Sequence, residues 1–251
     1  NNPAIKLDST SRYVMTLFHL LRCYIDDRKF DQARDLINEI RELATKKGFN
    51  SIDLTVKIFG NSYIQELSLY HAEGQFKKSL ELLPIIEENQ LAFQGKLSKE
   101  IDILLVYNIA YSYFGVGEYK KALHYLNEVL NDNEQNLRQD VYSFSRLFNL
   151  VIHFELENYD FLDYIIKSTN RYLNKQERDY QVEFVFIKYL RKLAKVQSGI
   201  QQMEIYERLY EELKLLLEDH NERVVLEYFN VEAWVQSKLK KTTFENAVRS
   251  L

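Results

Sequence analysis

The residue types that most often carry catalytic or metal chemistry are few in this chain and are spread apart. None of the five histidines stands four residues from another, and no HExxH motif occurs; they are His19, His71, His124, His153 and His220. A zinc site needs three or four converging ligands, so we expect no metal. Cys23 lies beside Arg22, which could lower the pKa of the thiol. A lone cysteine on an apolar helix is more often a small core residue.

Motifs for nucleophilic attack or phosphate binding are also missing. No GxSxG occurs, and Gly115-Val116-Gly117 has no phosphate-loop continuation, so we interpret it as a turn. The adjacent carboxylates Glu87-Glu88 and Glu211-Glu212 point in different directions on a helix and do not form a glycosidase-like pair. The sequence therefore predicts a protein that is not an enzyme and has no cofactor.

Two runs of side chains at helical spacing could bind a partner instead. One is an aromatic stripe at i, i+4 and i+7 that consists of Tyr107, Tyr111 and Phe114. Its rings and hydroxyl tips suit a peptide or a partner helix, although the same spacing is typical of a helix face packed in a core. The other is a basic stripe that consists of Lys188, Arg191, Lys192 and Lys195. It could capture an acidic segment or form a solvated helix face.

Composition indicates the elements that hold these side chains. The 251 residues include only 7 Gly and 2 Pro. Tight turns between strands need glycine and proline, whereas long helices avoid them, so we expect an all-α fold. The net charge of −4 gives no basic footprint for direct nucleic-acid binding. No apolar run is long enough to span a membrane. The single cysteine and the lack of a visible signal peptide favour a cytoplasmic location.

A turn segment recurs four times, in residues 24–33, 70–79, 113–122 and 153–162. Each begins with Tyr or His and continues through a short turn to an aromatic residue; these aromatics are Phe30, Phe76, Tyr119 and Tyr159, separated by 46, 43 and 40 residues. The residue three positions after the aromatic is small in the first three segments, where it is Ala33, Ser79 and Ala122. In the fourth segment it is Leu162. We expect a helical hairpin at each turn, and a fifth, degenerate one near Ser198-Gly199.

Apolar spacing predicts about eleven helices within a single domain that covers residues 1–251. We expect them at 8–26, 29–47, 51–73, 75–92, 97–115, 118–132, 137–156, 158–174, 178–197, 200–219 and 221–240. Asp8, Ser51 and Ser98 are predicted to cap helix starts. Pro84 should kink the fourth helix, and the last helix, with Trp234, should cover the end of the array.

The third turn segment resembles the tetratricopeptide repeat (TPR), as found in bacterial proteins with long, irregular repeats. Val106 stands where that family often has Trp, Ile109 and Ala110 at its Leu-Gly pair, Tyr113 at its Tyr and Ala122 at its small position. Glu134 replaces the closing Pro. The resemblance covers residues 8–200. It implies an α-solenoid, a right-handed superhelix of antiparallel hairpins over 8–219, with a capping helix at 221–240.

In TPR proteins the first helix of each hairpin lines a concave groove. Carried over position by position, the resemblance implies a groove that includes Arg22, Asn61, Ser68, His71, Tyr107, Tyr111, Phe114, Lys188, Lys192 and Lys195. The Lys and Asn of the chaperone-binding clamp are missing, because Phe18 and Arg22 occupy those positions in the first unit. Recognition of a chaperone C-terminus is therefore not expected.

The sequence predicts a protein–protein interaction scaffold that binds a peptide or partner protein in its concave groove. The alternative is the peptide-sensing domain of a bacterial transcription regulator, which the length and irregular period also resemble. In that case Asn61 and Asn108 would bind peptide backbone, and a DNA-binding domain would lie outside these residues. The identity of the partner is not encoded in any motif, and homo-oligomerisation stays open.

Overall fold

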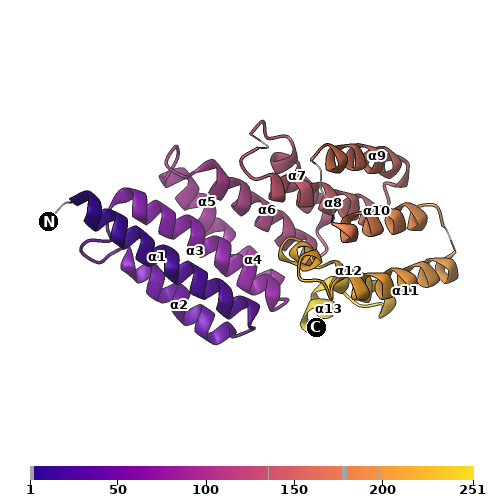
Figure 1. Ribbon diagram of the computed structural model, residues 1–251, viewed down its shortest axis with the longest axis horizontal. Coiled ribbons are helices and arrows are strands. Elements are labelled where there is room, and N and C mark those ends of the chain that lie inside the picture. Colours follow the sequence, from indigo (N-terminus) through magenta and orange to yellow (C-terminus); the bar gives the residue numbers. More distant parts are fainter. Residues whose placement is uncertain (1–2, 135, 177–179, 197) are drawn as a thin grey trace. The chain divides into compact units, whose positions relative to one another are not determined.

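The chain is helical throughout the part that the computed structural model describes, which is residues 3–134, 136–176, 180–196 and 198–251 (Figure 1). These residues form thirteen α-helices and one 3-10 helix, and no strand. The all-α prediction is confirmed. The chain divides into two compact units, Asn1–Ser112 and Tyr113–Leu251, which are described one at a time. The prediction of one domain over residues 1–251 stays a prediction.

The first unit is built from helices that pack against their neighbours in the chain. Its helices are α1 (Pro3–Asp26), α2 (Phe30–Leu43), α3 (Ile52–Ala72), α4 (Phe76–Glu81), α5 (Leu83–Ala92) and most of α6 (Lys99–Gly115). α1 packs on α2 and α3, α2 on α3, and α3 on α4. Gly60 of α3 lets Ile101 of α6 approach closely. The predicted caps Ser51 and Ser98 are confirmed, since each side chain accepts a backbone N–H three residues on. The predicted helix start at Asp8 is wrong, because α1 begins at Pro3.

Pro84 breaks the fourth predicted helix, as expected. α4 ends at Glu81 and α5 begins at Leu83, so Pro84 lies in the first turn of α5, where its missing N–H costs no helical hydrogen bond. The two short helices remain in contact with each other. A continuous helix over 75–92 is therefore replaced by a kinked pair.

The second unit contains the remaining helices around an aromatic core. They are α7 (Tyr119–Leu130), α8 (Gln139–Glu155), α9 (Tyr159–Lys175), α10 (Gln181–Leu193), α11 (Gly199–Leu216), the 3-10 helix η1 (Glu222–Glu227), α12 (Val231–Leu239) and α13 (Phe244–Arg249). α8 packs against α7, α9 and α10, α10 against α11, α11 against α12, and α12 against α13. Phe114 lies at the centre of the core, with its ring against Phe148, Phe229 and Phe244.

The predicted continuous helix over 221–240 is wrong. The Glu222 carboxylate turns toward the start of α10, where it accepts the backbone N–H groups of Gln181 (2.9 Å) and Val182 (2.8 Å). Asn230 then begins a new helix, because its side chain accepts the N–H of Ala233 at 2.8 Å. The distant bonds of Glu222 and the local cap at Asn230 therefore accompany a break between η1 and α12. A further helix, α13, was not predicted.

The repeated turn segment has one physical explanation, a Schellman motif at the end of a helix. Residues 28, 74, 117 and 157 all have positive φ. In each segment the next N–H donates to the carbonyl of the initial Tyr or His; the bonds are Lys29 to Tyr24 (2.8 Å), Gln75 to Tyr70 (2.7 Å), Glu118 to Tyr113 (2.9 Å) and Asn158 to His153 (3.0 Å). This bond pattern satisfies the last carbonyls of the helix. The sequence pattern therefore marks four equivalent helix ends.

A fifth turn of the same kind lies between α12 and α13. Lys241 has φ of 50°, and the Thr242 N–H donates to the Ser237 carbonyl at 2.9 Å. The loop has one extra residue before the next helix, whose cap is Thr243. α10 and α11 do form a hairpin whose second helix starts at the predicted Gly199, but residue 197 of that connection lies outside the described residues. The repeat thus recurs beyond the predicted range.

The small residue that follows each turn is fully enclosed. Ala33, Ser79, Ala122 and Leu162 all have 0% exposure, and so does Ala247 after the fifth turn. Leu162 shows that the position requires burial more strictly than it requires a small side chain. The burial expected at this position, where the helices of a hairpin are predicted to pack closely, is confirmed.

Replacing Gly117 with alanine should lower the free energy of unfolding by about 1 kcal/mol, because an L residue is strained at positive φ. Gly117 has φ of 81°, and an added Cβ would meet no heavy atom within 4 Å, so the backbone alone causes the loss. Urea unfolding measures it. Gly199→Ala is the control, since its φ is ordinary and its surroundings are equally open. An equal effect of both substitutions would contradict this explanation.

Candidate functional site

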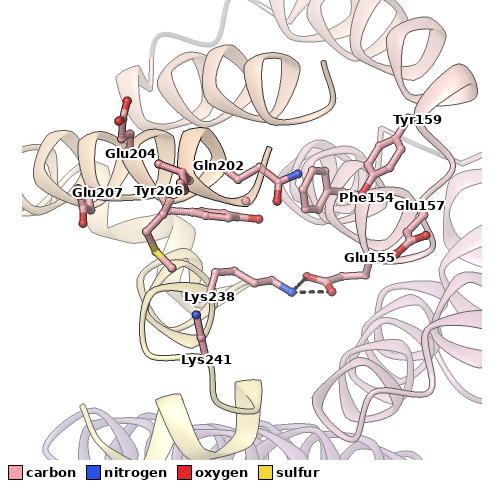
Figure 2. A pocket seen from close by; sticks show the side chains of 13 residues that line it. Phe154, Glu155, Glu157, Tyr159, Gln202, Glu204, Tyr206, Glu207, Lys238 and Lys241 are labelled. Atoms are coloured by element: carbon pink, nitrogen blue, oxygen red, sulfur yellow. Dashed lines mark hydrogen bonds and ion pairs between the residues drawn. The ribbon is translucent and has the colours of Figure 1, made fainter. Parts of the chain in front are cut away.

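A cavity of about 710 Å³ lies within the second unit (Figure 2). It is bounded by the end of α8, the first turn of α9, the first half of α11 and the end of α12. Its lining residues are Phe154, Glu155, Glu157, Tyr159, Gly199, Ile200, Gln202, Met203, Glu204, Tyr206, Glu207, Lys238 and Lys241. Cavities of this size are typical of sites that bind a ligand or a short segment of a partner.

The inner wall of the cavity is aromatic and rigid. Phe154 and Tyr206 are 6% and 7% exposed, and both contact the buried Trp234 edge to face, with ring centroids 5.8 Å apart in each case. Figure 2 shows the Tyr206 hydroxyl directed across the cavity toward Phe154. Because Trp234 supports both rings from behind, their positions are fixed before any ligand arrives.

The floor of the cavity is a buried carboxylate with three donors. Glu155, whose side chain is 8% exposed, accepts the indole N–H of Trp234 at 2.5 Å and pairs with the Lys238 ammonium at 2.6 Å. It also accepts a hydrogen bond from the Tyr119 hydroxyl. Figure 2 shows the Glu155–Lys238 pair crossing the cavity. The network joins α7, α8 and α12, so it fixes the cavity as well as filling its base.

Burial is the main influence on the pKa of the tyrosine hydroxyls in and beside the cavity. Burial and the negative charge of Glu155 raise the pKa of both Tyr206 and Tyr119. Burial and the charges of Glu157 and Glu155 raise the pKa of Tyr159. The three phenols therefore stay neutral at physiological pH, and each keeps a hydroxyl oxygen that can accept a hydrogen bond.

The mouth of the cavity is exposed and carries uneven charge. Ile200 is 77% exposed and Tyr159 37% exposed, so large apolar surface faces solvent there. Three exposed carboxylates belong to the lining, namely those of Glu157, Glu204 and Glu207. Lys241 is the only exposed ammonium in the lining, since Lys238 is 29% exposed and paired with Glu155. In chemical terms the cavity can hold an apolar stem and a polar or charged end.

Three residues of the predicted groove are half-buried in the first unit. Arg22 pairs with Asp26 of the same helix at 3.0 Å. Asn61 donates its side-chain N–H to the Lys57 carbonyl at 2.9 Å, also within its helix. Ser68 is half-buried on α3. The role of these residues in binding a partner stays a prediction.

The aromatic stripe (Tyr107, Tyr111 and Phe114) is buried. Its exposures are 3%, 8% and 1%, respectively, and Asn108 beside it is 8% exposed and bonded to the Leu104 carbonyl. This is the packing alternative that the sequence left open. Phe154 and Tyr206 are as deeply buried but line the cavity, whereas none of these four side chains does. We therefore place the stripe in the core and leave it and Asn108 out of the proposed binding surface.

His71, predicted to line the groove, is likewise buried. Its ring stacks on Phe76 and meets the Tyr111 ring edge to face at 4.9 Å between centroids. The Ser112 hydroxyl donates to the Asn108 carbonyl (2.9 Å), so its oxygen is left to accept the Nε2–H of His71 at 2.8 Å. Burial lowers the pKa of His71 to about 3. The imidazole is therefore neutral and belongs to the core.

In the basic stripe, Lys188, Arg191 and Lys192 lie on α10 and Lys195 follows the end of that helix; the three lysines are exposed. Lys188 pairs with Glu212 of α11 at 2.9 Å. Lys188 and Lys192 both hold their ammonium groups 4.8 Å from the centre of the Tyr189 ring. Two of the lysines thus have intramolecular partners, and the solvated helix face fits this arrangement. Capture of an acidic segment stays a prediction.

None of the eleven predicted site residues lines the cavity. The fourth turn segment contained a signal for one side of it, because Phe154, Glu155, Glu157 and Tyr159 all lie within residues 153–162. The other side comes from α11 and the turn after α12, some 40 to 80 residues later in the chain. No local pattern links these segments. Among the residues that the structure describes, no group of three or more His, Cys, Asp or Glu could hold a metal ion.

We expect the buried His71 to make the protein less stable as the pH falls. The unfolded chain binds a proton near pH 6.5, whereas the folded chain does so only near pH 3. Below pH 6.5 the unfolded state therefore gains protons, and stability falls by about 1.4 kcal/mol per pH unit. The His71→Gln side chain can still donate a hydrogen bond to Ser112. Between pH 7 and pH 5, the free energy of unfolding of this variant should fall by about 2 kcal/mol less than that of the native chain.

Urea unfolding followed by circular dichroism at the two pH values measures this difference. His124→Gln is the matched control, because the His124 side chain is 74% exposed. The prediction fails if the two variants show the same pH dependence.

Comparison with family models, with curated proteins and with solved structures finds no match to this chain. Over the described part of the chain, no helix combines the length and apolarity needed to cross a membrane.

Proposed function

We propose that this chain is a non-catalytic interaction scaffold of the TPR kind, which binds a peptide or a partner protein. The observation that carries the proposal is the recurrence of one Schellman turn after five helices, each followed by a fully buried residue at the start of the next helix. Stacked hairpins of this kind bury one face against their neighbours and leave another free for binding. We extend this to a right-handed α-solenoid with a concave groove.

The cavity in the second unit is the surface that we assign to binding. It combines rigid aromatic walls with exposed apolar surface at its mouth, as protein-binding sites commonly do. A cytoplasmic location remains part of the proposal.

The cavity also favours the alternative, a peptide-sensing domain of a bacterial transcription regulator. A volume of about 710 Å³ suits a short peptide as well as one segment of a larger partner. The regulator would require a DNA-binding domain outside these residues. Sequencing the complete gene distinguishes the two: an upstream DNA-binding domain favours the regulator, and additional repeats or a membrane anchor favour the scaffold.

Selection of displayed short peptides of random sequence on the immobilised chain tests the binding function itself. We expect a small set of related peptides to be enriched and to bind the chain in solution, measured by fluorescence polarisation. The reference surface is the Ala122→Glu chain, which should be unfolded. Equal recovery on both surfaces would show that peptides adsorb to apolar segments, and the proposed function would be rejected.

A further inference from the structure

The charges around the cavity are not balanced. Four carboxylates and two ammonium groups belong to its lining. Glu155 and Lys238 neutralise each other on the floor, which leaves Glu157, Glu204 and Glu207 against Lys241. Figure 2 shows Glu204 and Glu207 at one edge of the cavity and Glu157 at the opposite edge. The charge of these exposed lining residues therefore favours the approach of a positively charged group.

The interior beyond this rim also suits a cation. Tyr159, which is 37% exposed, offers an aromatic ring at the mouth, and such π surfaces attract ammonium and guanidinium groups. The Tyr206 hydroxyl oxygen and the Glu155 carboxylate offer acceptors at the far end. An anion, in contrast, would meet one exposed lysine and three exposed carboxylates.

We infer that this cavity takes the side chain of an arginine or lysine from a segment of a partner protein, with apolar residues of that segment covering Ile200 at the mouth. The inference rests on the proposed binding function and names the chemistry of the partner. A peptide is favoured over a small free amine because Ile200 is 77% exposed. Only an occupant that continues outside the cavity can cover it.

Gly199 offers a way to close the cavity without disturbing the core. It lines the cavity at the start of α11, and a Cβ added there would meet no heavy atom within 4 Å. Gly199→Phe should therefore occupy the mouth while the fold stays intact. Gln201→Phe places the same ring at an exposed position of α11 outside the lining and is the matched control.

Charge reversal tests the cation directly. Glu157→Lys combined with Glu204→Lys changes two exposed lining residues. Glu211→Lys combined with Glu218→Lys makes the same change in charge at two exposed positions outside the lining. Both double variants should unfold like the native chain in urea, since none of the four side chains is buried.

The probe is the set of peptides selected from the displayed random library on the native chain. We expect Arg or Lys at one position beside apolar residues, and replacement of that residue by Glu in the peptide should weaken binding on the order of tenfold or more. The double variant Glu157→Lys, Glu204→Lys should bind the basic peptide more weakly by a similar factor and should bind the Glu version of the peptide more tightly than the native chain does. Gly199→Phe should abolish binding, and both controls should leave it unchanged.

The outcomes separate the two proposals. Selected peptides that lack a basic residue, or that bind Gly199→Phe as well as the native chain, would overturn the arginine or lysine inference and leave the scaffold function standing. Failure to select any peptide above the unfolded reference would overturn both.

Discussion

Replacement of Ala122 by glutamate is expected to unfold Tyr113–Leu251 in the absence of denaturant. Ala122 has 0% exposure on α7, a helix that packs against α8. A carboxylate there would lose its hydration without a partner, and we expect a cost of about 4 kcal/mol or more. That is most of the free energy of unfolding of a domain at the lower end of the usual range, about 5 kcal/mol. Trp234, the single tryptophan of the chain, lies inside this unit and reports its unfolding by fluorescence.

Two substitutions separate burial from other effects of Ala122→Glu. Asn127→Glu adds the same charge at an exposed position of α7 and should leave the Trp234 emission and the urea midpoint nearly unchanged. Ala122→Ser should cost little, because Ser79 is buried at the equivalent position and donates its hydroxyl to the Phe76 carbonyl at 2.7 Å. Native-like fluorescence and cooperative unfolding of Ala122→Glu would show that the hairpins do not depend on this contact.

The turns could be predicted from the sequence because their causes are local. A Schellman motif needs a residue that tolerates positive φ, and Gly74 and Gly117 supply it in two segments. The buried residue five positions later was also recognisable in three of the four segments. Arg28, Glu157 and Lys241 adopt the same conformation without being glycine. The turn at Lys241 was not found from the sequence because its segment starts with Ser237 and has one extra residue before the next helix.

Features that depend on distant parts of the chain could not be predicted. The helix over 221–240 is interrupted because Glu222 caps α10, about 40 residues earlier. Helical periodicity also has the same form in a core and on an exposed face, so Tyr107 and Tyr111 could have belonged to either. Their burial follows from neighbours such as His71 and Phe76, which only the fold brings to them.

Replacement of Glu155 by alanine should destabilise the second unit by about 3–5 kcal/mol, because it leaves a buried charge network without its central acceptor. The Trp234 indole N–H and the Tyr119 hydroxyl would lose their partner, and Lys238 would keep its charge beside the aromatic wall. Unsatisfied buried donors cost free energy beyond the loss of the bond itself. Urea unfolding followed by Trp234 fluorescence measures the loss.

Glu245→Ala serves as the control for removal of an ion pair. Its partner Arg249 lies one turn away on the same helix and is 49% exposed, so we expect a cost of at most about 1 kcal/mol. A similar loss in Glu155→Ala would mean that Glu155 is no more important than a surface residue.

A double variant decides whether Glu155 stabilises the unit by attraction or only by satisfying its partners. If the damage in Glu155→Ala comes from the unpaired Lys238, then adding Lys238→Met should recover part of the lost stability, since an apolar stem can pack against Trp234 without needing an acceptor. If the orphaned Trp234 and Tyr119 donors cause it, the double variant should be no more stable than the single one. Recovery would show that Glu155 stabilises the unit mainly by pairing with the charge of Lys238. No recovery would show that it does so mainly through the hydrogen bonds that fix the aromatic wall.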